Sequence, residues 1–287
     1  MSERIAIVTD STADLPHDLA AELGVTVVPF DLRFGHERFR DGIDLTTDDL
    51  IGRIEETGRT PATSSPSPRT FTEVFTELAE DHDGILAILM SSHLSSVVKS
   101  ARIAASQVEA ASASSVPIEI VDSLNVSLGL GLQVMRAASL VRAGLSLAVV
   151  AEQLRTEVPA NHLVFFLEQL DLQRQRGRVG KGPEVVGTVL QLKPVLRLDE
   201  GQVIPHERAR TRAKALDMLV DFAGSLPAID EIGIIYDTTP DDVETLRERL
   251  ATIAPDARLD TVQFGPALAA HLGPGVVGLA IRERLTA

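Results

Sequence analysis

Hydroxyl side chains gather in two short turns of this chain, Thr63-Ser64-Ser65-Pro66-Ser67 and Ser91-Ser92-His93-Leu94-Ser95-Ser96. Each turn is followed by apolar residues at helical spacing, so each is expected to open an amphipathic helix. The start of a helix leaves backbone N–H groups without partners, and with nearby hydroxyls they suit an anion such as a carboxylate or a phosphate. Capping alone explains one serine or threonine at a helix start. Three or more hydroxyls in each of two successive turns favour a ligand site that includes Thr63, Ser64, Ser92, Ser95 and Ser96.

Groups that would attack a ligand are not evident in the sequence. Neither turn contains the Gly-x-Ser-x-Gly nucleophile elbow, and no neighbouring carboxylate marks His93 as the base of a serine. The acidic residues near Asp10 lack the second Asp of a phosphatase-type Mg²⁺ site, and Lys181 does not lie in a phosphate-binding loop. We therefore predict a binding protein that is not an enzyme and has no catalytic residues, cofactor or metal. The alternative is a lipid or acyl-ester hydrolase that uses a serine of residues 91–96 with His93 or His271.

Composition narrows the class of ligand and partner. The chain has 287 residues, of which 44% are hydrophobic and 3% aromatic, so its core must be mostly aliphatic. A net charge of −14 would repel a polyanion and argues against nucleic-acid binding. The absence of cysteine excludes disulfides and thiolate metal sites. No stretch reaches the ~18 apolar residues that span a bilayer, and the N-terminus lacks the pattern of a signal peptide. We expect a cytoplasmic protein without stable membrane insertion.

The order of the expected elements predicts an α/β fold with two domains. In residues 1–160, apolar strands alternate with helical patterns, which favours a mainly parallel sheet with right-handed crossovers. The polar turns would follow the carboxyl ends of strands, where open α/β sheets bind their ligands. For residues 161–287 the order of elements predicts a mixed-sheet α/β sandwich that includes a hairpin around Asp199-Glu200-Gly201. We place a basic loop at 173–181 and a helix at 183–191 in this second domain.

Several short motifs occur in a particular order along the chain. They are Val8-Thr9-Asp10-Ser11, Asp41-Gly42-Ile43-Asp44, the two hydroxyl turns, Asp122-Ser123, Arg176-Gly177-Arg178-Val179, Arg210-Thr211-Arg212, and Gly265-Pro266 with His271-Leu272-Gly273-Pro274-Gly275. In this order and spacing the chain resembles the DegV family of fatty-acid-binding proteins over nearly its whole length. Two positions depart from the commonest pattern of that family. Ser65 stands where Gln is frequent, and Ser96-Val97 stands where Gly-Thr is frequent.

The resemblance implies a function that the hydroxyl turns alone leave open. It implies a long-chain fatty acid of the palmitate or oleate type in a tunnel between two α/β domains, with its carboxylate bonded by Thr63 and Ser95. His271 would lie beside the head group. It further implies a fatty acid kinase subunit as partner, which phosphorylates the bound carboxylate and supplies acyl phosphate to phospholipid synthesis. Arg178 and Arg210 or Arg212 would then face the kinase or the new acyl phosphate. A carrier for another amphipathic anion is a further alternative.

Overall fold

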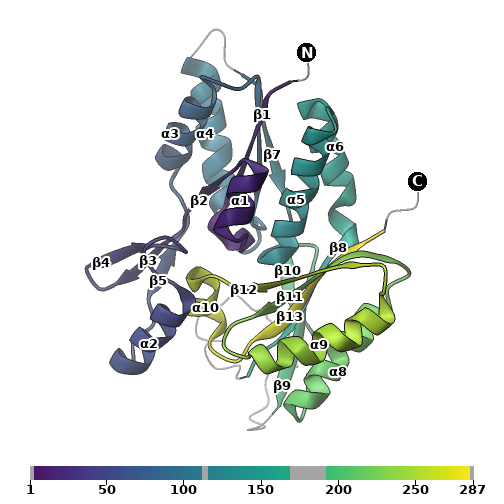
Figure 1. Ribbon diagram of the computed structural model, residues 1–287. Helices are drawn as coiled ribbons and strands as arrows, with labels where there is room; N and C mark the ends of the chain where they lie inside the picture. Colours follow the sequence, from purple (N-terminus) through teal and green to yellow (C-terminus); the bar gives the residue numbers. More distant parts are fainter. Residues whose placement is uncertain (1–2, 112–115, 169–191, 285–287) are drawn as a thin grey trace.

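A computed structural model of the protein describes residues 3–111, 116–168 and 192–284 (Figure 1). The N-terminal part contains a parallel sheet of four strands in the order β2-β1-β6-β7. Its strands are β1 (Ile5–Asp10), β2 (Val25–Val28), β6 (Gly84–Leu89) and β7 (Ile118–Asp122). β1 and β6 lie in the middle of this sheet and are buried along their whole length, as the apolar sequence of β6 and the apolar first four residues of β1 predict. The predicted parallel sheet is therefore confirmed.

Helices cover both faces of the parallel sheet. α3 (Pro68–Leu78) and α4 (Val97–Ala111) lie on one face, and α1 (His17–Leu23), α5 (Leu128–Arg142) and α6 (Leu147–Glu157) lie on the other (Figure 1). Short 3₁₀ turns follow β1 (η1, Ser11–Ala13) and α6 (η2, Val158–Ala160). α5 is almost wholly buried, because it packs on β1 and β6 and also on β8, β11 and β13 of the C-terminal part. It therefore joins the two sheets into one structure.

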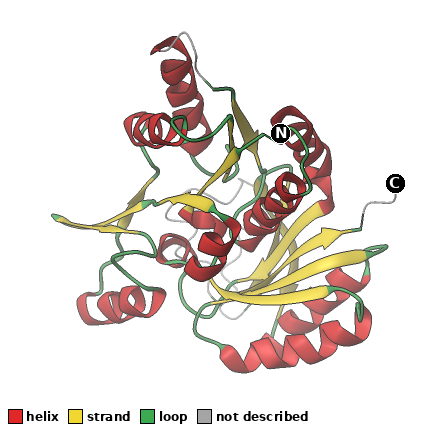
Figure 2. Cartoon of the chain, turned by 45° about the horizontal axis from the view of Figure 1, so that its top comes forward, coloured by secondary structure: helices red, strands yellow, loops and turns green. Residues whose placement is uncertain are grey.

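A small antiparallel sheet projects from the N-terminal part (Figures 1 and 2). It consists of β3 (Asp31–Phe34), β4 (Glu37–Arg40) and β5 (Ala62–Ser64) in the order β4-β3-β5, and α2 (Thr47–Thr57) accompanies it. β3 and β4 form an antiparallel hairpin. β5 was not expected, because it has only three residues and pairs with a strand about thirty residues away. Thr63, which the sequence placed in a turn, therefore lies in a strand.

The C-terminal part is built on a mixed sheet of six strands in the order β10-β9-β8-β13-β11-β12. β11 and β12 run parallel and the other neighbours run antiparallel, so the predicted mixed sheet is confirmed. α8 and α9 pack on one face, and α5 packs on the other (Figure 1). The elements are β8 (Asn161–Phe166), β9 (Lys193–Asp199), β10 (Gln202–Ala209), α8 (Arg212–Gly224), β11 (Ile229–Tyr236), α9 (Pro240–Ile253), β12 (Arg258–Gln263), α10 (Pro266–Leu272) and β13 (Val277–Glu283).

One helix of the C-terminal part leaves its own sheet. α10 packs against α2, β3 and β5, which all belong to the N-terminal part. Figure 1 shows it between the small sheet and the six-stranded sheet. The division of the chain at residue 160 stays a prediction. The basic loop at 173–181 and the helix at 183–191 lie outside the described residues.

Candidate functional site

The two hydroxyl turns meet in one polar pocket. Its walls come from β5 and the turn before α3, from the turn before α4, and from α10. They are formed by Thr12, Phe30, Thr63, Ser64, Ser65, Met90, Ser95, Ser96, Ala267, Leu268 and His271. Five of the six predicted head-group residues, Thr63, Ser64, Ser95, Ser96 and His271, are therefore brought together. Only Ser92 does not line this pocket.

Direct hydrogen bonds connect the walls of the polar pocket. The Thr63 hydroxyl lies 2.6 Å from His271 Nε2, although 208 positions separate the two residues in sequence. The Ser65 and Ser96 hydroxyls lie 3.0 Å apart and join one hydroxyl turn to the other. These contacts place hydroxyls and an imidazole around one space, which is a suitable environment for an anionic head group.

Local structure explains the orientation of each turn. Pairing of Thr63 with Leu32 in the small sheet puts both side chains on the same face. Ser67 caps α3 by accepting a hydrogen bond from the N–H of Thr70 at 3.2 Å, with Pro68 at the first helical position. The Ser95 hydroxyl accepts a hydrogen bond from the N–H of Val97 at 3.3 Å. Capping therefore occupies part of the hydroxyl set, while Thr63, Ser64, Ser65, Ser95 and Ser96 line the pocket.

The turn before α4 is fastened to the C-terminal part by the tip of the β9–β10 hairpin. The Ser91 hydroxyl donates a hydrogen bond to the Gly201 carbonyl at 2.8 Å. Gly201 has φ +78°, and a Cβ added there would lie 2.5 Å from Ser91 Oγ. Only glycine fits this contact without displacement. The next residue, Ser92, donates its N–H to Asp122 at 3.2 Å and lines a hollow over α4 instead of the polar pocket.

An apolar cavity adjoins the polar pocket. Its floor is the face of the six-stranded sheet that α5 partly covers. Phe165, Gly278 and Ile235 stand side by side there on three neighbouring strands. The complete lining is Met90, Leu94, Val126, Ser127, Leu163, Phe165, Val203, Ile235, Phe264, Leu268, His271, Leu272, Val276 and Gly278. Nearly all of these side chains are apolar, so the cavity suits a hydrocarbon.

The apolar cavity and the polar pocket have three residues in common: Met90, Leu268 and His271. Beside this floor α5 lies close to the sheet, since a Cβ at Gly233 would meet Leu128 of that helix at 2.2 Å. Together the two spaces form a site with a hydroxyl-lined end and a hydrocarbon-lined end. Such a shape matches a long amphipathic molecule with an acidic head group.

Three buried carboxyl groups lie behind the polar pocket. Asp10 accepts hydrogen bonds from the N–H groups of Met90 (2.8 Å) and Thr12 (3.0 Å). Burial raises the pKa of Asp10 to about 6 and the pKa of Asp14 to about 8, and it also raises the pKa of Asp41. The cause is the loss of water around the charged form, which hydrogen bonds offset only in part.

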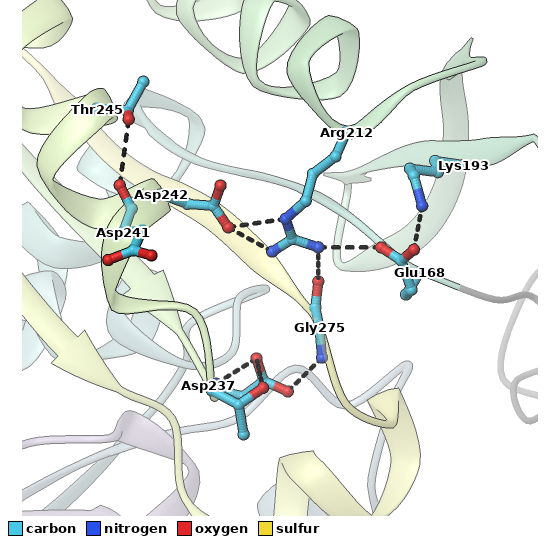
Figure 3. A network of polar contacts seen from close by, with 9 residues as sticks. Glu168, Lys193, Arg212, Asp237, Asp241, Asp242, Thr245 and Gly275 are labelled. Carbon is cyan, nitrogen blue, oxygen red and sulfur yellow. Dashed lines mark hydrogen bonds and ion pairs between the residues drawn. The ribbon is translucent and has the colours of Figure 1, made fainter.

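Arg212 lies in a network of polar contacts that Figure 3 shows. Its guanidinium donates to Asp242 at 2.6 and 2.8 Å, to Glu168 at 3.0 Å and to the Gly275 carbonyl at 2.8 Å. It also lies over the ring of Phe166. Lys193 pairs with the other oxygen of Glu168. The guanidinium of Arg212 is therefore held inside the C-terminal part.

The other two predicted partner contacts differ from Arg212. Arg210 is exposed just before α8, and Arg178 lies outside the described residues.

Comparison with known proteins places the chain in a family. The family model described as "Uncharacterised protein, DegV family" matches residues 4–284. The chain belongs to the DegV family. A DegV domain-containing protein from Deinococcus radiodurans is 34% identical over 283 residues, which cover 96% of this chain and 98% of the relative.

Solved structures of DegV proteins have the same fold. A DegV family protein from Thermus thermophilus, described for its fatty acid binding, matches with 34% identity and a TM-score of 0.89, over 98% of this chain and 100% of the other. DegV from Bacillus subtilis, described as a fatty acid binding protein, matches with 26% identity and a TM-score of 0.87, over 99% and 100%.

Sequence reasoning did not identify several residues of this DegV site. The sequence did not indicate Asp14 or Asp41 as residues of the candidate site, and it did not locate the floor of the cavity. One signal was available: Gly278 interrupts a strand of large apolar residues, and glycine inside a strand often marks a close approach. Among the described residues, no group of His, Asp and Glu side chains could hold a metal ion. No helix in the described part of the chain is long and apolar enough to cross a membrane.

Proposed function

We propose that this chain binds one long-chain fatty acid of the palmitate or oleate type. The acyl chain lies in the apolar cavity, and the carboxylate lies in the polar pocket near Thr63, Ser95 and His271. The observation that carries the proposal is the adjacency of the two spaces, which share Met90, Leu268 and His271 as lining residues. Two DegV relatives described as fatty acid binding support the same ligand class.

Magnitudes assign different roles to the two ends of the ligand. Burial of about 15 methylenes at ~0.8 kcal/mol each gives roughly 12 kcal/mol before costs are subtracted. Each hydrogen bond to a charged carboxylate contributes about 1.5–3 kcal/mol. The acyl chain therefore supplies most of the affinity. The hydroxyls and His271 determine where the carboxylate stops.

A defined carboxylate position matters for the second half of the proposal. We propose that the protein is a carrier that presents the carboxylate to a fatty acid kinase subunit, and that the resulting acyl phosphate supplies phospholipid synthesis. The head-group pocket is bounded partly by exposed residues, Ser64 and Ser96, so the carboxylate lies near the surface. Arg210 and Arg178 stay proposed contacts of the kinase. Arg212, with its guanidinium already bonded to Asp242 and Glu168, is a weaker candidate for this role.

Hydrolase chemistry receives no support from the contacts at the site. His271 bonds the hydroxyl of Thr63, while the Ser96 hydroxyl bonds Ser65. Labelling of Ser95 by a fluorophosphonate probe would favour the hydrolase over the carrier.

Mass spectrometry of the natively purified protein tests the carrier. We expect one co-purified fatty acid per chain, which added oleate or palmitate displaces. A protein that carries no fatty acid and takes up neither would refute fatty acid binding. Addition of a fatty acid kinase subunit and ATP to the loaded protein tests the second half. We expect acyl phosphate, trapped with hydroxylamine, and no product without ATP.

A further inference from the structure

α10 carries His271 and Leu268 into the site, yet its own sequence does not cap it. The N-cap residue is Gly265, which has no side chain, and Pro266 follows it at the first helical position. A serine, threonine or aspartate at an N-cap normally accepts a hydrogen bond from a free N–H of the first turn. In α10 that acceptor has to come from elsewhere in the chain.

The missing acceptor is a carboxylate of the N-terminal part. Asp41 Oδ1 accepts a hydrogen bond from the N–H of Ala267 at 2.8 Å, across 226 positions of sequence. Asp14 Oδ1 accepts a hydrogen bond from the N–H of Gly265, also at 2.8 Å. Both side chains are buried, with 3% and 8% of the residue exposed. Two buried carboxyl groups therefore hold the first turn of a helix that belongs to the C-terminal part.

Each carboxyl group is itself fixed to a wall of the site. Asp41 Oδ2 accepts a hydrogen bond at 2.6 Å from Ser11, whose hydroxyl also accepts the N–H of Phe30, a residue of the polar pocket. Asp14 Oδ2 accepts a hydrogen bond at 2.5 Å from Ser127, a residue of the apolar cavity. Through these hydrogen bonds the start of α10 is held in place relative to Phe30 of the polar pocket and Ser127 of the apolar cavity.

The loop after α10 is held by contacts within the C-terminal part. Gly275, in the loop after the helix, donates its N–H to Asp237 at 2.6 Å and accepts from Arg212 at 2.8 Å (Figure 3). The contacts of Asp14 and Asp41, with the hydrogen bond that the Thr47 hydroxyl donates to the Phe264 carbonyl at 2.6 Å, bind the start of the helix to the part of the chain that carries Thr63. His271 lies one turn and a half further along the same helix.

We propose that Asp41 and Asp14 are positioning residues of the site, which cap α10 from the N-terminal part and so hold His271 against Thr63. The part of this proposal that concerns the bound ligand rests on the proposed fatty acid binding. The part that concerns the position of His271 can be measured on the unliganded protein and is independent of it.

Moving the cap of α10 from Asp41 to the helix's own sequence distinguishes positioning of His271 from simple stabilisation of the helix. Asp41→Ala removes the acceptor of the Ala267 N–H. In the swapped-cap variant, Asp41→Ala with Gly265→Ser, the helix regains a cap from its own sequence: φ −72° and ψ 166° at Gly265 are values that serine adopts, and the nearest remaining atom, Asp14 Oδ1, lies 3.1 Å from the added Cβ. Asp41→Asn keeps an acceptor oxygen in the original place. Asp44→Ala is the matched control, since Asp44 lies in the same turn and pairs with Arg40 at the surface.

Two measurements are made on each variant: the dissociation rate of oleate, and the NMR signal of the His271 ring without ligand. We expect Asp41→Ala to release oleate about fivefold faster, the equivalent of one lost cap, and to shift the His271 signal. Asp41→Asn and Asp44→Ala should behave like the wild type. The swapped-cap variant should regain thermal stability while the oleate release and the His271 signal stay altered.

Recovery of all three properties in the swapped-cap variant would overturn the proposal, because capping alone would then explain Asp41. An unchanged His271 signal in Asp41→Ala would overturn it as well. If Asp41→Ala does not fold, the oleate release and the His271 signal of the swapped-cap variant are compared with those of the wild type instead. A wild-type protein that binds no oleate would refute the proposed function, and the His271 signal would still decide on positioning.

Discussion

The buried carboxyl group of Asp14 should make the protein less stable as the pH rises. Its pKa is about 8 in the folded protein, against an ordinary value of 3.8. Between these two values the folded state holds a proton that the unfolded state has lost. The stabilising contribution is therefore fully present below pH ~4 and is lost as the pH rises through about 8. Asp10, with a pKa of about 6, acts in the same direction over a narrower range.

The expected slope follows from proton linkage. A difference of one bound proton changes the free energy of unfolding by about 1.4 kcal/mol per pH unit. Between pH 5 and pH 7, Asp14 alone should therefore lower the free energy of unfolding by about 3 kcal/mol. Asp14→Asn removes this titration and retains a side chain with an acceptor oxygen. Asp14 has φ 51°, a backbone conformation that asparagine also tolerates.

Urea unfolding at pH 5, 6 and 7 measures the effect. The informative quantity is the difference between wild type and Asp14→Asn, because the contributions of groups that do not interact with Asp14 cancel in it. We expect that difference to change by about 1.4 kcal/mol per pH unit in favour of Asp14→Asn. Asp18→Asn, at an exposed position in α1, should give curves parallel to the wild type. Parallel curves for Asp14→Asn as well would refute the reasoning and would mean that Asp14 ionises normally in its buried site.

Three further outcomes are expected. Ser95→Ala should keep the fold and lower acyl phosphate formation more than oleate uptake, because the hydroxyl orients the carboxylate; equal losses in the two assays would contradict this division. Arg212→Ala should lower the free energy of unfolding by about 2 kcal/mol through the loss of charged hydrogen bonds, whereas exposed Arg210→Ala should leave urea unfolding unchanged and weaken coupling to the kinase. Gly201→Ala should lower the free energy of unfolding by about 1–2 kcal/mol because of its positive φ and its contact with Ser91. A double variant with Ser91→Ala should recover the part of this loss that is due to the contact. No recovery would mean that the whole loss comes from the backbone conformation.

The sequence predicts those parts of the fold that local patterns determine. The run from Gly84 to Leu89 has no polar residue, so a buried strand in a parallel sheet was the natural interpretation, and the structure confirms it. Two helix starts also follow from local rules: the N-cap of α3 at Ser67, and the start of α4 at Val97 after the second hydroxyl turn. β5 was not predicted, because its three residues form a strand only through pairing with β3.

The site depends on contacts that local patterns do not encode. Asp41 follows an exposed hairpin in sequence, where a carboxylate is normally solvated, and its burial comes from α10 more than two hundred residues later. Ser92 shows the opposite error. It lies among the hydroxyls of the second turn, yet it faces the hollow over α4. Membership of a hydroxyl-rich turn therefore indicates the neighbourhood of a pocket and leaves the direction of each side chain undetermined.

Two distant parts of the chain hold the two ends of the proposed ligand. The N-terminal part supplies the hydroxyls of Thr63 and Ser95, and the sheet of the C-terminal part supplies the hydrocarbon floor around Gly278. Methylene burial far outweighs one hydroxyl contact in free energy, so substitutions in the floor should change affinity first. Substitutions at the hydroxyls should change the place where the carboxylate stops. Since α10 contributes His271 and Leu268 to both spaces, its attachment to Asp14 and Asp41 links these two properties.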